Sequence, residues 1–210
     1  MNQSQRTESK DKTGRVTDSP LHYSLIKTPL RIISGSHKGR RLYAPSGLDV
    51  RPTSDKVKEA LFNILSDRIE GASFLDLYAG IGSIGIEALS RGAKEVVFVE
   101  KSKKHVGFLK KNLSLSPFEG RFDLFCMDAV DFLKKKKAGP FHLIFIDPPY
   151  EGEEIEKTLP LLGEGDMITD DATVIIQHFH KKILAEQTGR LRFIKRYKYG
   201  ETVLSFYGKG

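Results

Sequence analysis

Four consecutive residues, Asp147-Pro148-Pro149-Tyr150, could hold a weakly nucleophilic nitrogen. They follow residues 141–146, whose sequence Phe-His-Leu-Ile-Phe-Ile is typical of a buried strand. The two prolines end the strand, fix φ and remove two amide donors, but their carbonyls still accept hydrogen bonds. Asp147 and the Pro148 carbonyl therefore predict two acceptors aimed at one place, beside the flat ring of Tyr150.

The exocyclic amino group of a nucleobase fits such a ledge. Its lone pair is delocalised into the ring, so it becomes a useful nucleophile only when both N–H bonds are held. Stacking on Tyr150 would fix the ring and contribute about 1–3 kcal/mol per base. We predict a catalytic set of Asp147, Pro148, Pro149 and Tyr150, in which Asp147 removes a proton or only accepts a hydrogen bond. The alternative is an ordinary turn.

A glycine-rich loop at residues 76–85 predicts a second binding element. Gly80, Gly82 and Gly85 follow a strand-like run and open a helix, so the backbone can approach a ligand closely. Glu100 stands 20 positions after Gly80, where a carboxylate can accept hydrogen bonds from ribose hydroxyls. The glycine spacing alone fits a dinucleotide and a nucleoside equally well. A third interpretation is tight strand-to-helix packing without a ligand.

Asp76 favours one of these interpretations. A carboxylate just before the loop would repel a pyrophosphate, but it suits a cationic amino-acid group such as the ammonium of S-adenosylmethionine. Asp128, after the third strand, could bind an adenine amino group, cap the helix that follows, or do both. The residues predicted to bind the cofactor are Asp76, Tyr78, Ala79, Gly80, Gly82, Glu100, Asp128 and Ala129.

Basic residues near the N-terminus predict contact with a polyanion. Arg31, Lys38, Arg40, Arg41 and Arg51 fall within 21 positions that contain one acid, Asp49. Arginine binds phosphate bidentately, which gives affinity without sequence reading. We interpret the five residues as RNA-binding. The alternative is a hairpin edge whose charge prevents aggregation.

Other clusters of polar residues have simpler explanations. The run of lysines at 134–137 ends a predicted helix, where cations suit the helix dipole. His178 and His180 share one face of a strand, but nothing else joins them, so we predict no metal site. The single cysteine, Cys126, excludes a disulfide framework.

Alternating elements predict an α/β fold that positions these residues. Strand-like runs lie at 74–78, 95–100, 122–127, 141–146 and 173–177, with helical stretches near 83–91, 102–115, 129–137 and 153–162. Such alternation indicates crossover connections and a parallel sheet with helices on both faces. Residues 192–197 and 202–207 flank a turn at Tyr199-Gly200 and predict a C-terminal antiparallel hairpin. A helix after Thr53 or Ser54 would bury Val57 and Leu61.

Composition and patterning divide the chain into three parts. Residues 1–27 are polar and predict a flexible tail, residues 28–52 a basic β-hairpin extension, and residues 53–210 the main domain. Of 210 residues, 39% are hydrophobic, enough to bury a core, and the net charge of +7 permits a polyanionic partner. There is no membrane-length apolar run and no secretory signal pattern, so we expect a cytoplasmic protein with no membrane partner. We also expect a monomer.

On these motifs the chain resembles class I S-adenosylmethionine-dependent methyltransferases that modify amino groups. It is similar, more narrowly, to the bacterial family that methylates the N2 amino group of a guanine in 16S ribosomal RNA. The resemblance covers residues 30–207. It rests on the residues at 31–35, 38–40, 51–53, 59–63, 76–85, 87–93, 147–150 and 199–202.

This resemblance implies a Rossmann-like fold, with a mainly parallel seven-stranded sheet and an N-terminal β-hairpin that leans on RNA. It implies S-adenosylmethionine as methyl donor, S-adenosylhomocysteine as product, no metal, and 16S rRNA as partner, in a small ribosomal subunit or an assembly intermediate. One position departs from the family. After the fifth strand the family commonly carries Glu-His, whereas this chain has Gln177-His178.

Two other classes of function stay open on the sequence. An amino-methyltransferase acting on DNA or on another RNA would carry the same Asp-Pro-Pro-Tyr motif. An NAD-dependent oxidoreductase or a non-catalytic RNA-binding module would leave both Asp76 and that motif unexplained. Binding of S-adenosylhomocysteine in preference to NADH discriminates between these classes.

Overall fold

The strand-like runs form one eight-stranded sheet in the computed structural model, which describes residues 30–45, 55–115, 118, 120–135, 138–149 and 152–210. Its spatial order is β3-β2-β1-β4-β5-β8-β7-β6. The first five strands are parallel and the last three are antiparallel. In chain order the strands are β1 (Ser73–Asp76), β2 (Glu95–Val99), β3 (Phe122–Phe125), β4 (Phe141–Ile146), β5 (Ile168–Phe179), β6 (Gln187–Thr188), β7 (Leu191–Tyr199) and β8 (Thr202–Lys209).

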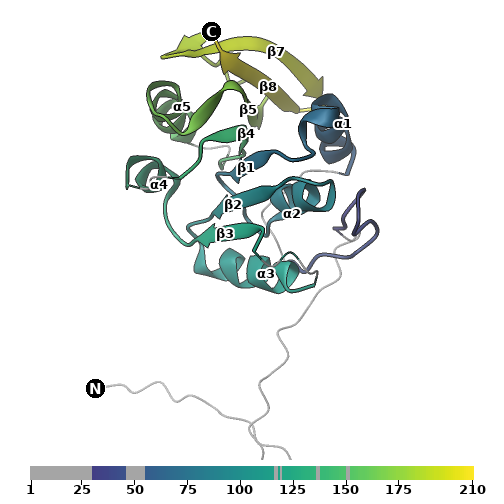
Figure 1. The fold of residues 1–210 in the computed structure, drawn as a ribbon. Coiled ribbons are helices and arrows are strands. Elements are labelled where there is room, and N and C mark those ends of the chain that lie inside the picture. Colours follow the sequence, from purple (N-terminus) through teal and green to yellow (C-terminus); the bar gives the residue numbers. More distant parts are fainter. Residues whose placement is uncertain (1–29, 46–54, 116–117, 119, 136–137, 150–151) are drawn as a thin grey trace, which may run out of the picture.

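Helices cover both faces of this sheet (Figure 1). One face packs against the first three helices and the N-terminal segment, and the other packs against the last two helices. We call them the α2 face and the α5 face. The helices are α1 (Asp55–Leu65), α2 (Ser83–Ser90), α3 (Lys103–Leu113), α4 (Ala129–Lys135) and α5 (Glu154–Glu164), with a 3-10 turn, η1 (Ser66–Arg68). None of the described helices is long and apolar enough to cross a membrane.

The predicted fold class is confirmed, and the differences lie at the edges. β4 begins and ends where the apolar run predicts. The sheet has eight strands where seven were expected, because the two-residue β6 pairs with the start of β7. β5 begins at Ile168, five residues before the predicted start, since the exposed Asp170 and Asp171 interrupt its apolar pattern. The turn between β7 and β8 lies at residues 200–201.

The N-terminal segment (residues 30–45) is less regular than the predicted hairpin. Its two arms run antiparallel, with Leu42 N–H donating to the Leu30 carbonyl at 2.8 Å, but they share a single β-bridge, Arg31 to Arg41. Ile32 N–H also donates across to the Arg40 carbonyl at 2.9 Å, but the next two amides of the first arm bond elsewhere. Ile33 N–H and Ser34 N–H donate to the Glu87 carboxylate of α2 at 2.7 and 2.9 Å. The helix therefore holds the first arm beyond Ile32, where the hydrogen bonds between the two arms end.

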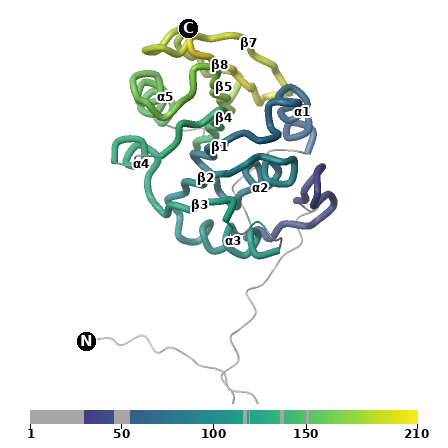
Figure 2. Tube along the Cα trace, viewed as in Figure 1, coloured from purple at the N-terminus to yellow at the C-terminus, as the bar shows by residue number. Residues whose placement is uncertain are grey.

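A buried ion pair anchors this segment. Lys58 of α1 and Glu87 are both fully buried and 3.6 Å apart, and Lys58 Nζ donates to the Arg31 carbonyl at 2.6 Å. Burial lowers the pKa of Lys58, and the negative charge of Glu87 opposes that shift. Gly35, at φ +82°, passes so close to Ser90 that an added Cβ would lie 1.9 Å from the Ser90 carbonyl oxygen. Figure 2 shows the segment lying along α2.

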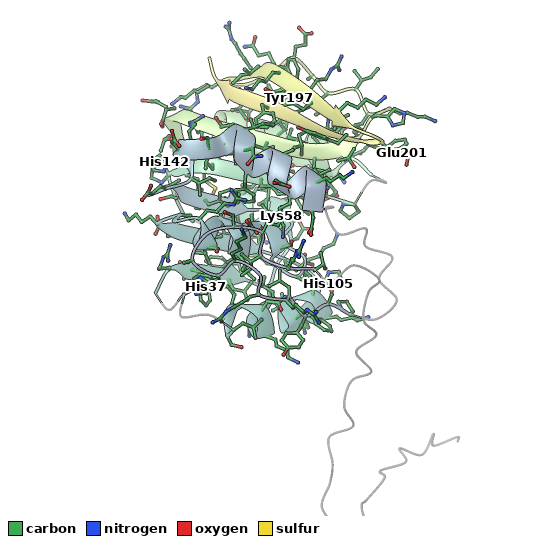
Figure 3. The ribbon with its side chains drawn as sticks, turned by 90° about the vertical axis from the view of Figure 1, so that its right-hand side faces the viewer. His37, Lys58, His105, His142, Tyr197 and Glu201 are labelled. Atoms are coloured by element: carbon green, nitrogen blue, oxygen red, sulfur yellow. The ribbon has the colours of Figure 1, made fainter. Side chains whose placement is uncertain are left out.

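All five parallel strands end at one edge of the sheet, which we call the carboxyl edge. Figure 3 shows His105, at the start of α3, and Glu201, in the β7–β8 turn, at one side of the molecule and His142, near the start of β4, at the other. The predicted cofactor and catalytic residues follow β1, β2, β3 and β4 at this edge. Three predictions, the tail at 1–27, Arg51 and Tyr150, lie outside the described residues.

Candidate active site

Asp76 ends β1 as a buried carboxylate that faces the start of α2. Its side chain is 2% exposed, and its Oδ2 accepts a hydrogen bond from Gly85 N–H at 3.0 Å. Burial raises the pKa of Asp76 to about 7, the Gly85 hydrogen bond opposes that shift, and the charge of Glu100 adds to it. A cation beside Asp76 would stabilise the ionised form that burial disfavours. The site therefore suits a positively charged ligand group.

Glu100 follows β2 and holds two loops together. Its Oε2 accepts from Gly80 N–H at 2.8 Å, and its Oε1 accepts from Ser102 N–H at 2.7 Å. His105 Nδ1 lies 3.7 Å from the same Oε1. Each carboxylate oxygen has a second lone pair, so Glu100 can hold the loop and still accept from a ribose hydroxyl.

The three glycines of the loop have different roles. At Gly80, with φ +55°, an added Cβ would meet nothing within 4 Å. At Gly82, with φ +85°, it would lie 2.2 Å from Leu109 Cδ1, and at Gly85 it would lie 2.2 Å from the Phe98 ring. Gly82 and Gly85 thus allow close packing inside the protein. Gly80 is the one of the three whose surroundings leave room for a ligand.

This geometry argues against the dinucleotide interpretation. In a dinucleotide site the loop amides at the helix N-terminus face a pyrophosphate. Here the carboxylates of Asp76 and Glu100 take the amides of Gly85 and Gly80. A pyrophosphate at this place would meet two negative charges, so the loop fits a cationic ligand better.

The remaining predicted cofactor residues surround the loop. Asp128 caps α4, because its Oδ1 accepts from Val130 N–H at 2.9 Å, which confirms the capping alternative and leaves the adenine contact a prediction. Ala129 is buried as the first residue of that helix. The Tyr78 hydroxyl donates to Glu154 Oε2 at 3.1 Å, and burial beside that carboxylate raises the pKa of Tyr78. Ala79 N–H donates to the Val99 carbonyl at 3.0 Å, which ties the loop to β2.

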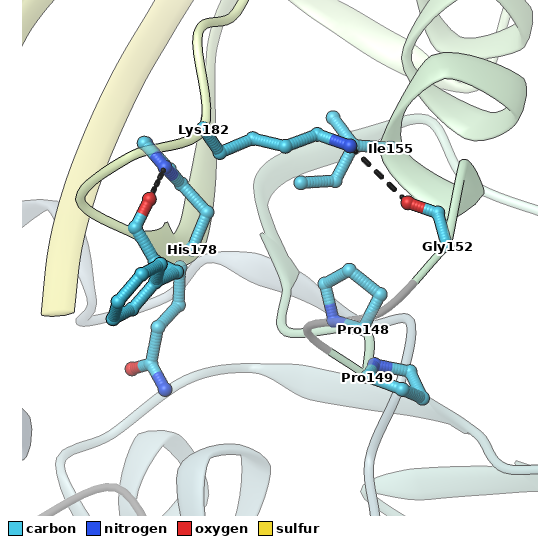
Figure 4. A pocket seen from close by; sticks show the side chains of 8 residues that line it. Pro148, Pro149, Gly152, Ile155, His178 and Lys182 are labelled. Atoms are coloured by element: carbon cyan, nitrogen blue, oxygen red, sulfur yellow. Dashed lines mark hydrogen bonds between the residues drawn. The ribbon is translucent and has the colours of Figure 1, made fainter.

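Asp147 follows β4 and is positioned by a side chain of the neighbouring strand. The buried Gln177 of β5 donates from Nε2 to Asp147 Oδ2 at 3.0 Å. Pro148 is buried and Pro149 is exposed, so the predicted ledge is partly embedded in the protein. Beside it lies a hollow that is open to solvent (Figure 4). It is lined by Pro148, Pro149, Ile155, Gln177, His178 and Lys182, among others.

Asp76 and Asp147 belong to adjacent strands. Asp76 pairs with Phe145, and Asp147 stands two residues after Phe145 on the same strand path. Residues two apart on a strand share a face, and neighbouring strands lie about 4.8 Å apart. Asp76 and Asp147 are therefore neighbours at the carboxyl edge, on the α2 face. Two reactants bound at these places would react as if they were parts of one molecule, because binding has already brought them together.

Of the predicted RNA-binding residues, the four that the structure describes are exposed and spread over the length of α2. Arg31 lies near the carboxyl edge, where it pairs with Asp55 at 3.4 Å and its backbone is held near Ser83 by Lys58. The turn with Lys38 lies by Ser90, at the other end of α2. Arg40 and Arg41 are exposed between these points.

The buried His178 ring makes its contacts inside the protein. His178 Nδ1 donates to the Phe179 carbonyl at 2.9 Å, and its Nε2 lies 2.8 Å from Ser205 Oγ, so both ring nitrogens are used. Burial lowers the pKa of His178, the hydrogen bond to the Phe179 carbonyl opposes that shift, and the charges of Arg196 and Lys182 lower the pKa further. Within the residues that the structure describes, no three His, Cys, Asp or Glu side chains are grouped to hold a metal.

Sequence reasoning missed two features. It treated Gln177 only as a departure from a family pattern and gave no contact between it and Asp147. The buried pair of Lys58 and Glu87 was also missed, although a Lys and a Glu within apolar helices are a recognisable signal, since such charges are almost never buried unless paired.

Comparison with known proteins agrees with this geometry. The sequence pattern of the family described as "Conserved hypothetical protein 95" matches residues 30–208. A Bacillus subtilis protein named "Putative rRNA methyltransferase YlbH" is 38% identical over 86% of this chain and 99% of its own length. "Ribosomal RNA small subunit methyltransferase D" of Haemophilus influenzae is 39% identical over 72% of this chain and 82% of its own.

A solved structure agrees as well. "Putative methyltransferase yhhF from Escherichia coli" superposes with a TM-score of 0.77 at 32% identity, covering 87% of this chain and 98% of that one. The likeness confirms the class I methyltransferase fold.

Proposed function

The chain belongs to the "Conserved hypothetical protein 95" family of S-adenosylmethionine-dependent methyltransferases, and we propose that it methylates the N2 amino group of a guanine in 16S ribosomal RNA. The observation that carries the proposal is the adjacency of Asp76 and Asp147 at the carboxyl edge. One suits the cationic end of the donor, and the other suits an amino group that accepts the methyl. The names of the relatives support ribosomal RNA as the substrate.

The donor half of the site is formed by β1, β2 and their loops. Asp76 binds the ammonium group, Glu100 accepts from the ribose hydroxyls, and Gly80 lets the backbone come close. Asp128 keeps one carboxylate oxygen for α4 and offers the other to the adenine amino group. When bound, S-adenosylmethionine supplies an electrophilic methyl group on a sulfonium.

The acceptor half holds the target nitrogen. Asp147 and the Pro148 carbonyl accept its two N–H bonds, so the lone pair turns away from the base ring and towards the donor. Gln177 donates a hydrogen bond to Oδ2 of Asp147 and thereby fixes the orientation of the carboxylate. The product nitrogen gives up one proton, which Asp147 accepts or passes to solvent. Stacking on Tyr150 adds about 1–3 kcal/mol.

The target base has to leave its stack to reach this ledge, because Asp147 lies at the sheet edge between two loops. Unstacking costs a few kcal/mol, and least for a base in a loop or bulge. Single-stranded or looped rRNA is therefore the better substrate. Arg31, Lys38, Arg40 and Arg41 bind phosphates on the α2 face.

The test is to identify the methylated nucleoside. Purified protein, S-adenosylmethionine and unmodified 16S rRNA, naked or in isolated small subunits, are incubated, and the digested RNA is analysed by mass spectrometry. We expect N2-methylguanosine at a single position. N6-methyladenosine, or methylation of DNA instead of RNA, would replace this proposal with that of another amino-methyltransferase.

A further inference from the structure

A second concentration of positive charge lies far from the N-terminal segment, at the antiparallel end of the sheet. Residues 190–199 contain five Lys or Arg and no acid. Most of them belong to β7, at the antiparallel end of the sheet, where Arg196 and Lys198 are exposed. Neither the family motifs nor the proposed active site uses these residues.

A bulge in β7 decides which face these charges occupy. Phe193 pairs with Tyr207, but the register shifts between Phe193 and Lys195, and Arg196 then pairs with Ser205. Lys195 therefore turns to the α2 face, where its Nζ lies 5.3 Å from the centre of the Tyr197 ring. Arg196 and Lys198 share the α5 face, two residues apart.

The register places this pair beside the Asp-Pro-Pro ledge. Lys198 pairs with Val203, and Val203 pairs with His178, which lines the hollow next to Pro148. Two strand spacings amount to about 10 Å. In the neighbouring row, Arg196 pairs with Ser205, and Ser205 with Ile176.

Electrostatics agrees with this position. The charges of Arg196 and Lys182 both act on His178 and lower its pKa, so both lie close to the hollow. Lys182 is already held by Glu156 at 2.7 Å and by the Gly152 carbonyl at 3.2 Å, as Figure 4 shows for the carbonyl. Arg196 and Lys198 extend that positive charge outward along β7.

We propose that Arg196 and Lys198 form a second phosphate-binding surface, which holds the RNA backbone on the α5 face while the N-terminal segment holds it on the α2 face. This inference rests on the proposed RNA substrate. The backbone would then cross the carboxyl edge between two basic regions, with the target base turned inward at Asp147.

Protection of a sheet edge is the competing explanation, because charged residues on an edge strand hinder pairing with other chains. Within the described chain, no strand pairs with the outer side of β7 after Arg192. Charge at any position along the outer side of β7 would protect that edge. Arg196 and Lys198 instead both lie near the carboxyl end of β7, on the α5 face. The two explanations differ in what salt does to RNA binding.

The experiment compares two double variants that each remove two positive charges. One is Arg196→Gln with Lys198→Gln. The control is Lys94→Gln with Arg192→Gln. Both residues are exposed, and they lie where β2 and β7 begin, at the end of the strands opposite the carboxyl edge. The substrate is naked 16S rRNA or isolated small subunits, whichever the wild-type protein methylates. The equilibrium constant for binding of the protein to this substrate is measured over a range of salt concentrations. Binding of S-adenosylhomocysteine monitors folding.

We expect the first variant to reduce the slope of log K against log [salt] by about 1.4–1.8, since each lost phosphate contact contributes about 0.7–0.9. The KM for RNA should rise while kcat and S-adenosylhomocysteine binding stay unchanged, and the control should keep the wild-type slope. An unchanged slope in the first variant, or an equal loss in the control, overturns the second surface and leaves the proposed function standing. Failure of the wild-type protein to bind or methylate rRNA overturns both.

Discussion

The donor half and the acceptor half of the carboxyl edge are built by different means. At β1 and β2, Asp76 and Glu100 accept hydrogen bonds from backbone amides of the glycine loop and the loop after β2. At β4 and β5, Asp147 is held by the side chain of Gln177. Loop conformation therefore sets the first half, and one residue on a neighbouring strand sets the second.

This difference separates binding from reaction. A substitution in the donor half should change affinity for the donor, because we propose that its carboxylates contact the ligand, and they also accept hydrogen bonds from the glycine loop. A substitution in the acceptor half should change the rate and spare that affinity.

The largest effect is expected for Asp147→Ala. Removing the acceptor of the target N–H should lower kcat by about 10²–10⁴-fold, the range typical of a positioned acid or base. S-adenosylhomocysteine affinity, measured by calorimetry, should stay within about twofold of wild type, as should both parameters in Asp123→Ala, an exposed aspartate on β3. Equal loss of rate and donor affinity would mean that the two halves do not separate.

The next largest is expected for Asp76→Asn, which keeps an oxygen for Gly85 N–H but removes the charge. Donor affinity should fall by about 2 kcal/mol or more, roughly 30-fold, because a buried ammonium loses its counter-charge. The free energy of unfolding of the donor-free protein should instead rise. The pKa of Asp76 is raised from 3.8 to about 7, so its ionisation costs stability as pH rises through that interval.

That cost vanishes in the amide variant. The donor-free variant should therefore be more stable than wild type at pH 8, by up to about 4 kcal/mol, and equally stable near pH 4, as measured by urea unfolding. A variant that is less stable than wild type at pH 8 would contradict the assignment of Asp76 as a destabilised, ligand-binding carboxylate.

The same group predicts how donor binding depends on pH. Below pH 7 the free carboxyl of Asp76 is mostly protonated, and an ammonium ligand requires it ionised. Binding of S-adenosylhomocysteine at pH 6 should release about 0.9 proton, and affinity should fall towards tenfold per pH unit below 7. Calorimetry in two buffers of different ionisation enthalpy measures the proton. Release that persists in Asp76→Asn would point to another group.

A smaller, more specific effect is expected for Gln177→Glu. Two carboxyl groups would then lie about 3 Å apart and share a proton, which moves the acid limb of the kcat profile to higher pH by about one unit or more. Donor affinity should not change. An unshifted pH profile would show that Gln177 does not position Asp147 in the reacting complex.

The sequence predicts the features of the site that depend on residues close together in the chain. The predicted fold class and family resemblance are confirmed. They can be predicted because alternating elements and loop motifs depend on residues that are close together in the chain. Gly82 and Gly85 have packing roles that motif spacing does not reveal, since their partners, Leu109 and Phe98, come from later elements. The ligand roles of the predicted site residues stay predictions.

Contacts between distant residues account for what was missed. Gln177 is 30 positions from Asp147 in the chain, and only the register of β4 and β5 brings them together. The N-terminal segment was predicted as a regular hairpin because the local pattern favours one. Glu87, more than 50 positions away, instead takes the amides of Ile33 and Ser34, where the hydrogen bonds between the two arms end.

A crystal structure of the protein with S-adenosylhomocysteine tests the central claim most directly. The amino-acid end of the ligand should lie against Asp76, with its sulfur directed across the edge towards Asp147 and the Pro148 carbonyl. A ligand whose sulfur faces away from Asp147, or whose ammonium lies far from Asp76, would contradict the account.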